Sequence, residues 1–377
     1  MRLIALNENN ANKCAICGRP AWGDEAEREC FNPNTGEYET IRARFCIYHH
    51  SDHEKKAEEF WNTFLANFNS ERSEANPFGL LEREGDNLLH NFSQFIFPKF
   101  LESIKWEGRP FISANFFLAQ FQGETSFQWA QFQGEANFGW VKFQEEVSFS
   151  GAQFQEGANF SGAEFQEGAD FSEVEFQGGA RFWKAEFQEG ADFSLAKFQG
   201  EASFREAKIF SEILFKDTFF SDLVDFRGAE LLKHRDESEP TYGRLIFDGI
   251  EIADPAKLVL MGISNPDPEH CGIAFWLTRT PIVRGAEIGG TTLFDERGRM
   301  VVLEEYAERV LEEDKKELEN LPDEERRRRE REIERRNRDL LLQSYRAVRL
   351  NLEDKGMFPE AEELYVREMS IKLEKGP

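Results

Sequence analysis

The chain of 377 residues carries 46 Lys and Arg against 71 Asp and Glu, a formal net charge of −25, and 38 of its residues are Phe. This length predicts one elongated body or two to three modules, because domains average about 150 residues. The acidic balance argues against a DNA-binding groove and against an anionic membrane surface, and no apolar run approaches the roughly 18 residues of a membrane span. The start MRLIALNENN has no apolar signal core, so we expect a cytoplasmic protein.

Four of the five cysteines lie in the first 50 residues, in a pattern that indicates a metal site. Cys14 and Cys17 are separated by two residues, and Cys46 and His49 have the same spacing. Two such pairs on either side of a hairpin are typical of tetrahedral zinc, and a reducing compartment favours a metal over disulfides. The sequence therefore predicts Zn²⁺ as a structural cofactor, with Cys14, Cys17, Cys46 and His49 as its ligands.

Residues 1–70 are expected to form one small module around this site. Strands are predicted at 28–32 and 37–45, and an amphipathic helix is predicted after Ser51. Its apolar face would consist of Ala57, Phe60, Trp61, Phe64 and Phe68.

This module resembles a treble-clef zinc module over about 50 residues. Cys30, His50 or His53 could replace one member of the predicted ligand set. Some treble-clef relatives are nucleases with a catalytic His near the metal, and His50 and His53 raise this alternative. No accompanying Asn or second acidic pattern supports it, so we favour a structural role for the zinc.

Residues 71–110 are predicted to be a polar linker followed by a cap. The stretch SERSEANPFGLLEREGDN is rich in turn formers, whereas residues 88–110 bring apolar residues at irregular spacing. We interpret 88–110 as the cap that covers the open end of the repeat that follows. The alternative is one or two degenerate coils of the same repeat.

Phenylalanine then recurs with spacings that alternate strictly between five and six residues, which gives an eleven-residue unit. A small residue, usually Ala, lies two positions before nearly every Phe. A short fixed period that fits neither a helix nor an ordinary strand is typical of a solenoid. The seventeen positions are Phe116, Phe121, Phe127, Phe132, Phe138, Phe143, Phe149, Phe154, Phe160, Phe165, Phe171, Phe176, Phe182, Phe187, Phe193, Phe198 and Phe204.

The units ANFSG at 158–162 and ADFSE at 169–173 resemble pentapeptide repeats. The resemblance implies a mainly β fold, a right-handed quadrilateral β-helix in which each Phe and the preceding Ala point inward. Alternate units hold a sixth residue, as in AEFQEG at 163–168. Two eleven-residue units would thus make a coil of 22 residues, and we predict about five coils over 111–230.

A 22-residue coil aligns polar residues in columns on the four faces. We expect glutamine ladders on two opposite faces, an asparagine column on a third and a Ser and Asp column on the fourth. These columns support the coil, with a binding strip as the alternative, and no face shows a catalytic constellation. The columns are Gln122, Gln144, Gln166 and Gln188; Gln133, Gln155, Gln177 and Gln199; Asn115, Asn137 and Asn159; and Ser126, Ser148, Asp170 and Asp192.

Residues 231–300 are predicted to form a degenerate β-rich closing region, in which His270 and Cys271 are core or surface residues. Residues 301–377 read as a helical tail. Its Arg and Glu block at 324–338 is interpreted as a salt-bridged, solvated helix face and not as a nucleic-acid patch.

Residues 345–371 resemble a single tetratricopeptide-like hairpin with Gly356 in its turn. A similar tail is found in pentapeptide-repeat proteins that continue into channel-like membrane helices. Such helices would lie beyond Pro377.

The sequence therefore predicts a non-enzymatic scaffold on a rigid acidic rod, which binds a protein partner of unknown identity and does not bind nucleic acid directly. A homodimer is an alternative assembly. The first alternative function is a DNA mimic that modulates a topoisomerase, favoured by the charge and opposed by the arginines of the tail. The others are the soluble cytoplasmic part of a channel-like membrane protein and, last, a zinc nuclease that depends on His50.

Overall fold

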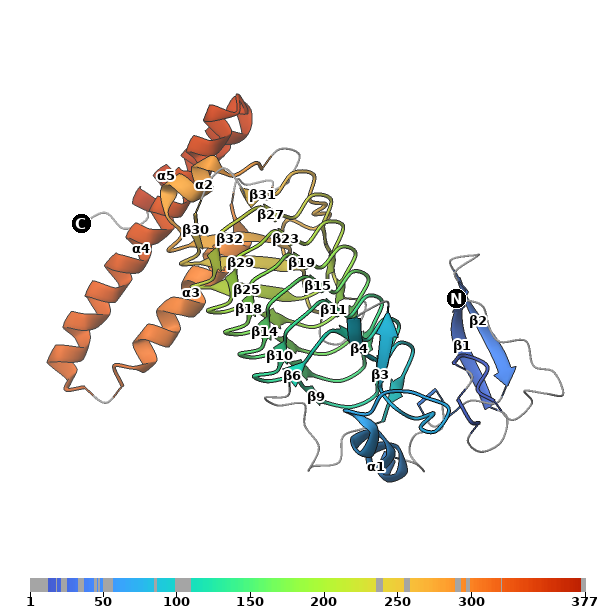
Figure 1. The fold of residues 1–377 in the computed structure, drawn as a ribbon. Helices are drawn as coiled ribbons and strands as arrows, with labels where there is room; N and C mark the ends of the chain where they lie inside the picture. The colour runs from blue at the N-terminus through green and yellow to red at the C-terminus, as the bar shows by residue number, and fades with distance from the viewer. Residues whose placement is uncertain are drawn as a thin grey trace.

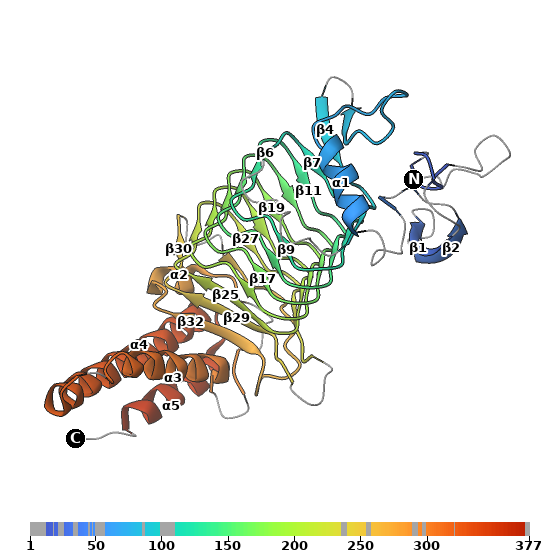
Figure 2. The same cartoon turned by 90° about the horizontal axis from the view of Figure 1, so that it is seen from below.

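The chain folds into a mainly β body with a metal module at one end and helices at the other (Figure 1). The computed structural model describes residues 13–17, 19–21, 26–32, 37–43, 46, 48–49, 57–84, 87–98, 110–234, 240–253, 258–288, 293–295, 299–319 and 321–373. Its centre is a β-solenoid of about six turns, which confirms the predicted fold class. Figure 2 shows the stacked turns with α1 against one end and α3 to α5 against the other.

Four parallel sheets form the four faces of the solenoid. The first face contains β4 (Asn87–Asn91), β7 (Ala114–Asn115), β11 (Ala136–Asn137), β15 (Ala158–Asn159), β19 (Ala180–Arg181), β23 (Ala202–Ser203), β27 (Val224–Asp225) and β31 (Leu258–Val259), with β3 (Leu81–Glu84) antiparallel at its edge. The second contains β5 (Ile96–Phe97), β8 (Gln120–Phe121), β12 (Lys142–Phe143), β16 (Glu164–Phe165), β20 (Glu186–Phe187), β24 (Lys208–Ile209) and β28 (Glu230–Leu231). The third contains β9 (Thr125–Ser126), β13 (Val147–Ser148), β17 (Ala169–Asp170), β21 (Ala191–Asp192), β25 (Glu212–Lys216), β29 (Arg244–Asp248) and β32 (Gly272–Trp276). The fourth contains β6 (Pro110–Phe111), β10 (Gln131–Phe132), β14 (Gln153–Phe154), β18 (Glu175–Phe176), β22 (Lys197–Phe198), β26 (Phe219–Phe220) and β30 (Glu251–Ile252).

The register confirms the 22-residue coil in the middle of the solenoid. Ala136 pairs with Ala158, and Phe143 pairs with Phe165 one coil further on. Every Phe of the repeat is buried, at most 1 % exposed, and rings stack from coil to coil, as Phe138 and Phe160 do at 4.9 Å. Each buried ring contributes on the order of 1.5–3 kcal/mol, so the ladder stabilises a body that has very short strands.

The polar columns behave differently from one another. The Nδ2 of Asn159 donates to the Oδ1 of Asn137 at 3.1 Å, and the ladder continues through Asn115 to Asn91. Each Asn is also held locally, because its Oδ1 accepts the backbone N–H two residues on, as at Gly139. The expected glutamine ladders are not formed. Among the described residues, no hydrogen bond joins glutamine side chains of successive coils, since the longer side chain has no such local anchor.

Two corners of each coil require a left-handed backbone, two residues after the Phe of the first and third faces. Trp140 occupies this corner with a φ of 55°, and Gly162 follows it one coil on with a φ of 67°. A Cβ added at Gly162 would lie 2.6 Å from the Cδ2 of Trp140, so the glycine provides both the conformation and the space for the indole.

The segment predicted as the cap, 88–110, instead begins the solenoid. His90 pairs with Ala114 and Phe97 with Phe121, so β4 and β5 belong to a first coil, the alternative that the sequence left open. The register here is 24 residues, which breaks the eleven-residue period. The end is covered by α1 (Ala57–Asn67), whose Phe64 ring lies 5.5 Å from that of Phe92.

The solenoid also extends beyond the predicted boundary at 230. Leu214 pairs with Ile246, and Ile246 pairs with Ala274. The spacing is now 32 and then 28 residues, because loops of different length are inserted between coils whose inward residues are Leu, Ile and Ala as well as Phe. The pairing therefore outlasts the period in the sequence.

Four helices follow the solenoid, α2 (Thr280–Gly285), α3 (Val301–Lys316), α4 (Asp323–Asp354) and α5 (Phe358–Leu373). The predicted turn at Gly356 is present, with a φ of 78°. Helix α3 packs on β32, α2 packs on α4, and α4 and α5 form the predicted hairpin. Within the described ranges, no helix combines the length and apolar character needed to cross a bilayer.

Candidate metal centre

A short knuckle and a hairpin bring the four predicted side chains into one place. The backbone N–H of Cys14 donates to the carbonyl of Arg19 at 2.8 Å, which closes the turn that presents Cys14 and Cys17. The antiparallel hairpin β1 (Ala26–Asn32) and β2 (Glu37–Ala43) leads back to Cys46. His49 follows in a turn closed by its N–H to the carbonyl of Cys46, 2.9 Å away.

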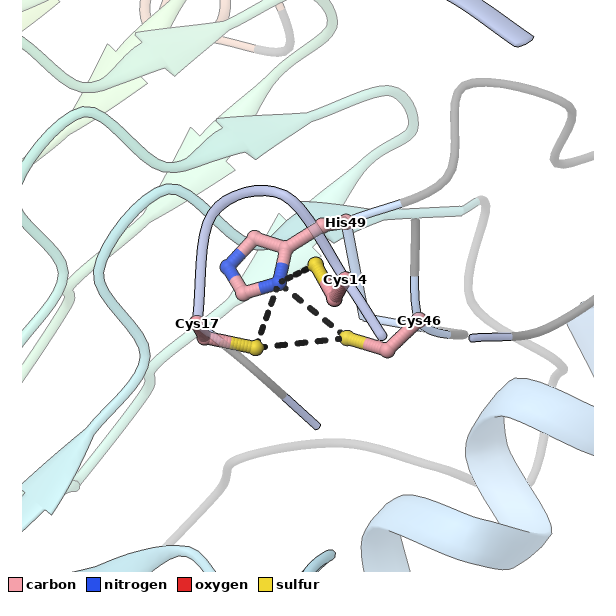
Figure 3. A group of neighbouring side chains, drawn as sticks. All are labelled: Cys14, Cys17, Cys46 and His49. Carbon is pink, nitrogen blue, oxygen red and sulfur yellow. Dashed lines mark hydrogen bonds between the residues drawn. The ribbon is translucent and has the colours of Figure 1, made fainter. Parts of the chain in front are cut away.

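Cys14, Cys17, Cys46 and His49 point toward a common centre (Figure 3). Their ligand atoms all lie within 4.8 Å of one another. The Nδ1 of His49 lies 3.1 Å from the Sγ of Cys46, 3.4 Å from that of Cys17 and 3.6 Å from that of Cys14. Cys14 and Cys46 are fully buried and His49 is 1 % exposed. This cluster could hold a metal ion.

A model of one protein family, described as pentapeptide repeats (9 copies), matches residues 141–186 and 182–230. The matched residues lie within the four-sided solenoid whose coils repeat every 22 residues. This segment of the chain is a pentapeptide-repeat solenoid. Searches of curated proteins and of solved structures gave no match. Pentapeptide-repeat solenoids are commonly scaffold or interaction proteins and are generally non-enzymatic.

The metal cluster is docked on the first coil of the pentapeptide-repeat solenoid through its own histidine. The Nε2 of His49 lies 3.2 Å from the carbonyl oxygen of Ser93, to which it donates when Nδ1 faces the sulfurs. Arg28 donates to the carbonyls of His49 and Gln94, both at 2.6 Å. The orientation of the imidazole therefore depends on the solenoid end.

The protonation states of the cluster suit a metal ligand set. Hydrogen bonds from Cys17 and Cys46 lower the pKa of Cys14 to about 2. Burial raises the pKa of Cys46 and lowers that of His49, which keeps the imidazole neutral. A neutral imidazole beside thiolate is the state in which these side chains bind metals.

Arg19 places a buried positive charge beside the sulfurs. Its side chain is 2 % exposed, and its Nε and Nη2 donate to the carbonyls of Pro77 at 3.0 Å and Gly79 at 3.2 Å. Burial opposes its charge, but the charges of Cys17 and Cys46 raise its pKa. No spacing in the sequence predicts this residue or Arg28, because both act on carbonyls far along the chain.

The candidate replacement ligands are placed only in part. Cys30 lies in β1, opposite Glu39. His50 and His53 lie outside the described residues.

Proposed function

We propose that the protein is a non-enzymatic scaffold that binds a protein partner through the modules at the two ends of its solenoid. The observation that carries this proposal is the filled interior, in which every Phe of the repeat is at most 1 % exposed. A packed rod of this kind offers its outer surface and its ends to a partner.

Both end modules are joined to the rod by buried polar contacts, which supports a fixed arrangement. At one end Arg28 bridges the carbonyls of His49 and Gln94. At the other, the Oη of Tyr306 donates to the Oδ2 of Asp248 at 2.7 Å, and Asn351 donates to the carbonyl of Ala286 at 2.7 Å. Satisfied buried polar contacts specify one geometry, so the modules would be held apart at a constant distance.

The scaffold proposal is tested by crosslinking and mass spectrometry on the full chain in an extract of its source cells. We expect a specific protein to be crosslinked to an end module, and to be lost from a variant that lacks α5 or carries Cys46→Ser. Absence of any protein that depends on either end would contradict the proposal.

We also propose that Cys14, Cys17, Cys46 and His49 bind one structural Zn²⁺ ion. Zn–S bonds of about 2.3 Å and Zn–N bonds of about 2.0–2.1 Å in a tetrahedron separate two sulfurs by about 3.8 Å and sulfur from nitrogen by about 3.6 Å. The Cys17 and Cys46 sulfurs are 3.7 Å apart, and the Nδ1 of His49 lies 3.1–3.6 Å from the sulfurs. Four protein ligands leave no open position for a substrate, which favours a structural role.

Elemental analysis of the purified protein tests the zinc proposal. We expect about one zinc per chain, and its loss in Cys46→Ser. Cys271→Ser is the control, because Cys271 is buried near the opposite end of the solenoid. A reducing compartment such as the cytoplasm would keep the thiols available, and we include that location in the proposal.

A further inference from the structure

A groove opens between α3, α4 and α5, where the three helices of the tail meet. Its volume is about 330 Å³, within the range of ligand-binding clefts. Ala307 and Leu311 of α3, Leu341 of α4 and Ile371 of α5 give it an apolar floor. Figure 2 shows the three helices side by side beyond the end of the solenoid.

Two arginines on the groove lack an ionic partner. Arg331 and Arg338 line it from α4, and neither makes an ion pair or hydrogen bond with the described residues. Other arginines of the same block are paired, Arg329 with Glu325 at 3.0 Å and Arg336 with Asp314 at 2.9 Å. The predicted salt-bridged helix face is thus present only in part.

The acidic residues of the groove are largely neutralised. Arg367 holds both carboxylate oxygens of Glu304, at 2.8 and 3.0 Å. Lys315 binds Glu334 at 2.7 Å, which leaves Glu308 as the acidic residue of the lining without an ion pair among the described residues. The groove therefore presents unpaired positive charge over an apolar floor, on a chain whose net charge is −25.

We propose that this groove binds an acidic amphipathic helix of a partner protein, an inference that rests on the proposed scaffold function. Three helices around an apolar floor leave the position of a fourth, and a helix laid in a groove contacts it through residues at i, i+3, i+4 and i+7. Arg331 and Arg338 are seven residues apart, about 10.5 Å along α4. The partner helix would carry two acidic residues about two turns apart with apolar residues between them.

The test measures binding of a fluorescein-labelled synthetic peptide to the full chain by fluorescence anisotropy. The peptide has about 15 residues, with Leu at helical spacing on one face and Glu two turns apart at its flanks. We expect saturable binding that falls at least about tenfold in Arg331→Glu/Arg338→Glu and by less in Arg331→Gln/Arg338→Gln. Both pairs should fold, because neither arginine holds a partner within the chain.

Arg327→Glu/Arg328→Glu is the matched control, with the same change in charge on exposed residues of α4 outside the groove lining. We expect it to bind the peptide like the wild type. Equal loss in both pairs, no binding by the wild type, or equal binding of a peptide with Lys for Glu would overturn the proposal. Duplex DNA or anionic lipid vesicles that bind in place of the peptide, and depend on Arg331 and Arg338, would also overturn it.

The same variants separate this proposal from the scaffold function. If the partner found by crosslinking is retained by Arg331→Glu/Arg338→Glu and the peptide does not bind, the scaffold stands and the groove proposal fails. If no partner is found but the peptide binds in the groove as expected, the groove proposal stands and the scaffold lacks support.

Discussion

Individual side chains of this protein are placed by the period of the repeat or by contacts that ignore it. Phe165 belongs to the first kind, because its ring stacks on Phe143 and Phe187 exactly one coil away on each side, at 5.4 and 5.0 Å. His90 belongs to the second, because it occupies an inward position of the irregular first coil. Each residue has a measurable consequence for stability.

Phe165→Asp should open the centre of the solenoid. The change removes a ring that is 1 % exposed and leaves a charge in its place, so we expect a loss of at least about 4 kcal/mol in the free energy of unfolding. Urea unfolding followed by circular dichroism measures it. Glu167→Lys, two residues away and exposed, is the control and should stay within about 0.5 kcal/mol. A similar loss in both variants would contradict an inward Phe ladder.

His90 should make the first coil sensitive to acid. The side chain is 2 % exposed, stacks on Phe68 at 4.6 Å, and neither ring nitrogen hydrogen bonds to the described residues. Burial lowers its pKa to about 4, so protons bind more tightly to the unfolded chain. The neutral form contributes fully above about pH 6.5, and on the order of 3 kcal/mol is lost as the pH falls toward 4.

The acid sensitivity is isolated by comparing His90→Phe with the wild type, since carboxylates and thiols also titrate. We expect the variant to gain stability over the wild type as the pH falls from about 7.5 to about 5. The measurement is the difference between their urea midpoints at each pH. A difference that does not change with pH would show that His90 does not titrate in the folded chain.

At the scale of elements, the metal module and the first coil depend on each other. Tyr48, between two predicted ligands, accepts the N–H of Ile96 at 2.9 Å through its backbone carbonyl, and its ring stacks on Phe95 at 4.6 Å. Loss of the metal would leave a knuckle too small to hold its own fold, because structural zinc supplies much of the folding free energy of such modules. Docking and metal binding should therefore be lost together.

Removal of the metal with a strong chelator should raise hydrogen exchange at the Ile96 amide. The amide of Gln166, which donates to Phe143 at 3.0 Å in the middle of the rod, should remain protected. Cys46→Ser should behave like the chelated wild type, and Cys271→Ser like the untreated protein. Unchanged exchange at Ile96 after chelation would show that docking does not need the metal.

At the scale of the whole molecule, the two ends of the rod must be covered. A parallel coil exposes unpaired backbone and an aromatic face at its end, and such an edge can template association with a second chain. Here the helix α1 covers that face, where the Trp61 and Phe97 rings lie 6.0 Å apart and the Phe60 and Phe97 rings 5.7 Å apart.

A chain that lacks residues 1–70 should therefore self-associate. We expect dimers or larger species in size-exclusion chromatography with light scattering, together with binding of a dye that reports exposed apolar surface. Deletion of residues 358–377 is the control, since α5 packs on α4. A monomeric, dye-negative protein after the first deletion would show that α1 is not needed as a cap.

The amino-acid sequence by itself determined the regular parts of this protein. The alternating spacing of Phe specified the 22-residue coil, because identical inward residues can stack only when the register equals the repeat. The paired spacings of Cys14, Cys17, Cys46 and His49 identified four side chains that the structure brings together. Both are local patterns, readable without knowledge of distant contacts.

Only the tertiary structure decided the parts that depend on residues far apart in the chain. It showed 87–97 as a first coil, α1 as the cap, and Ser93 as the partner of His49. It also showed which arginines of 324–338 find a carboxylate and which, such as Arg331 and Arg338, line a groove instead. A period fixes neighbours one coil away, but inserted loops and packed helices choose their neighbours by shape and charge, which no spacing records.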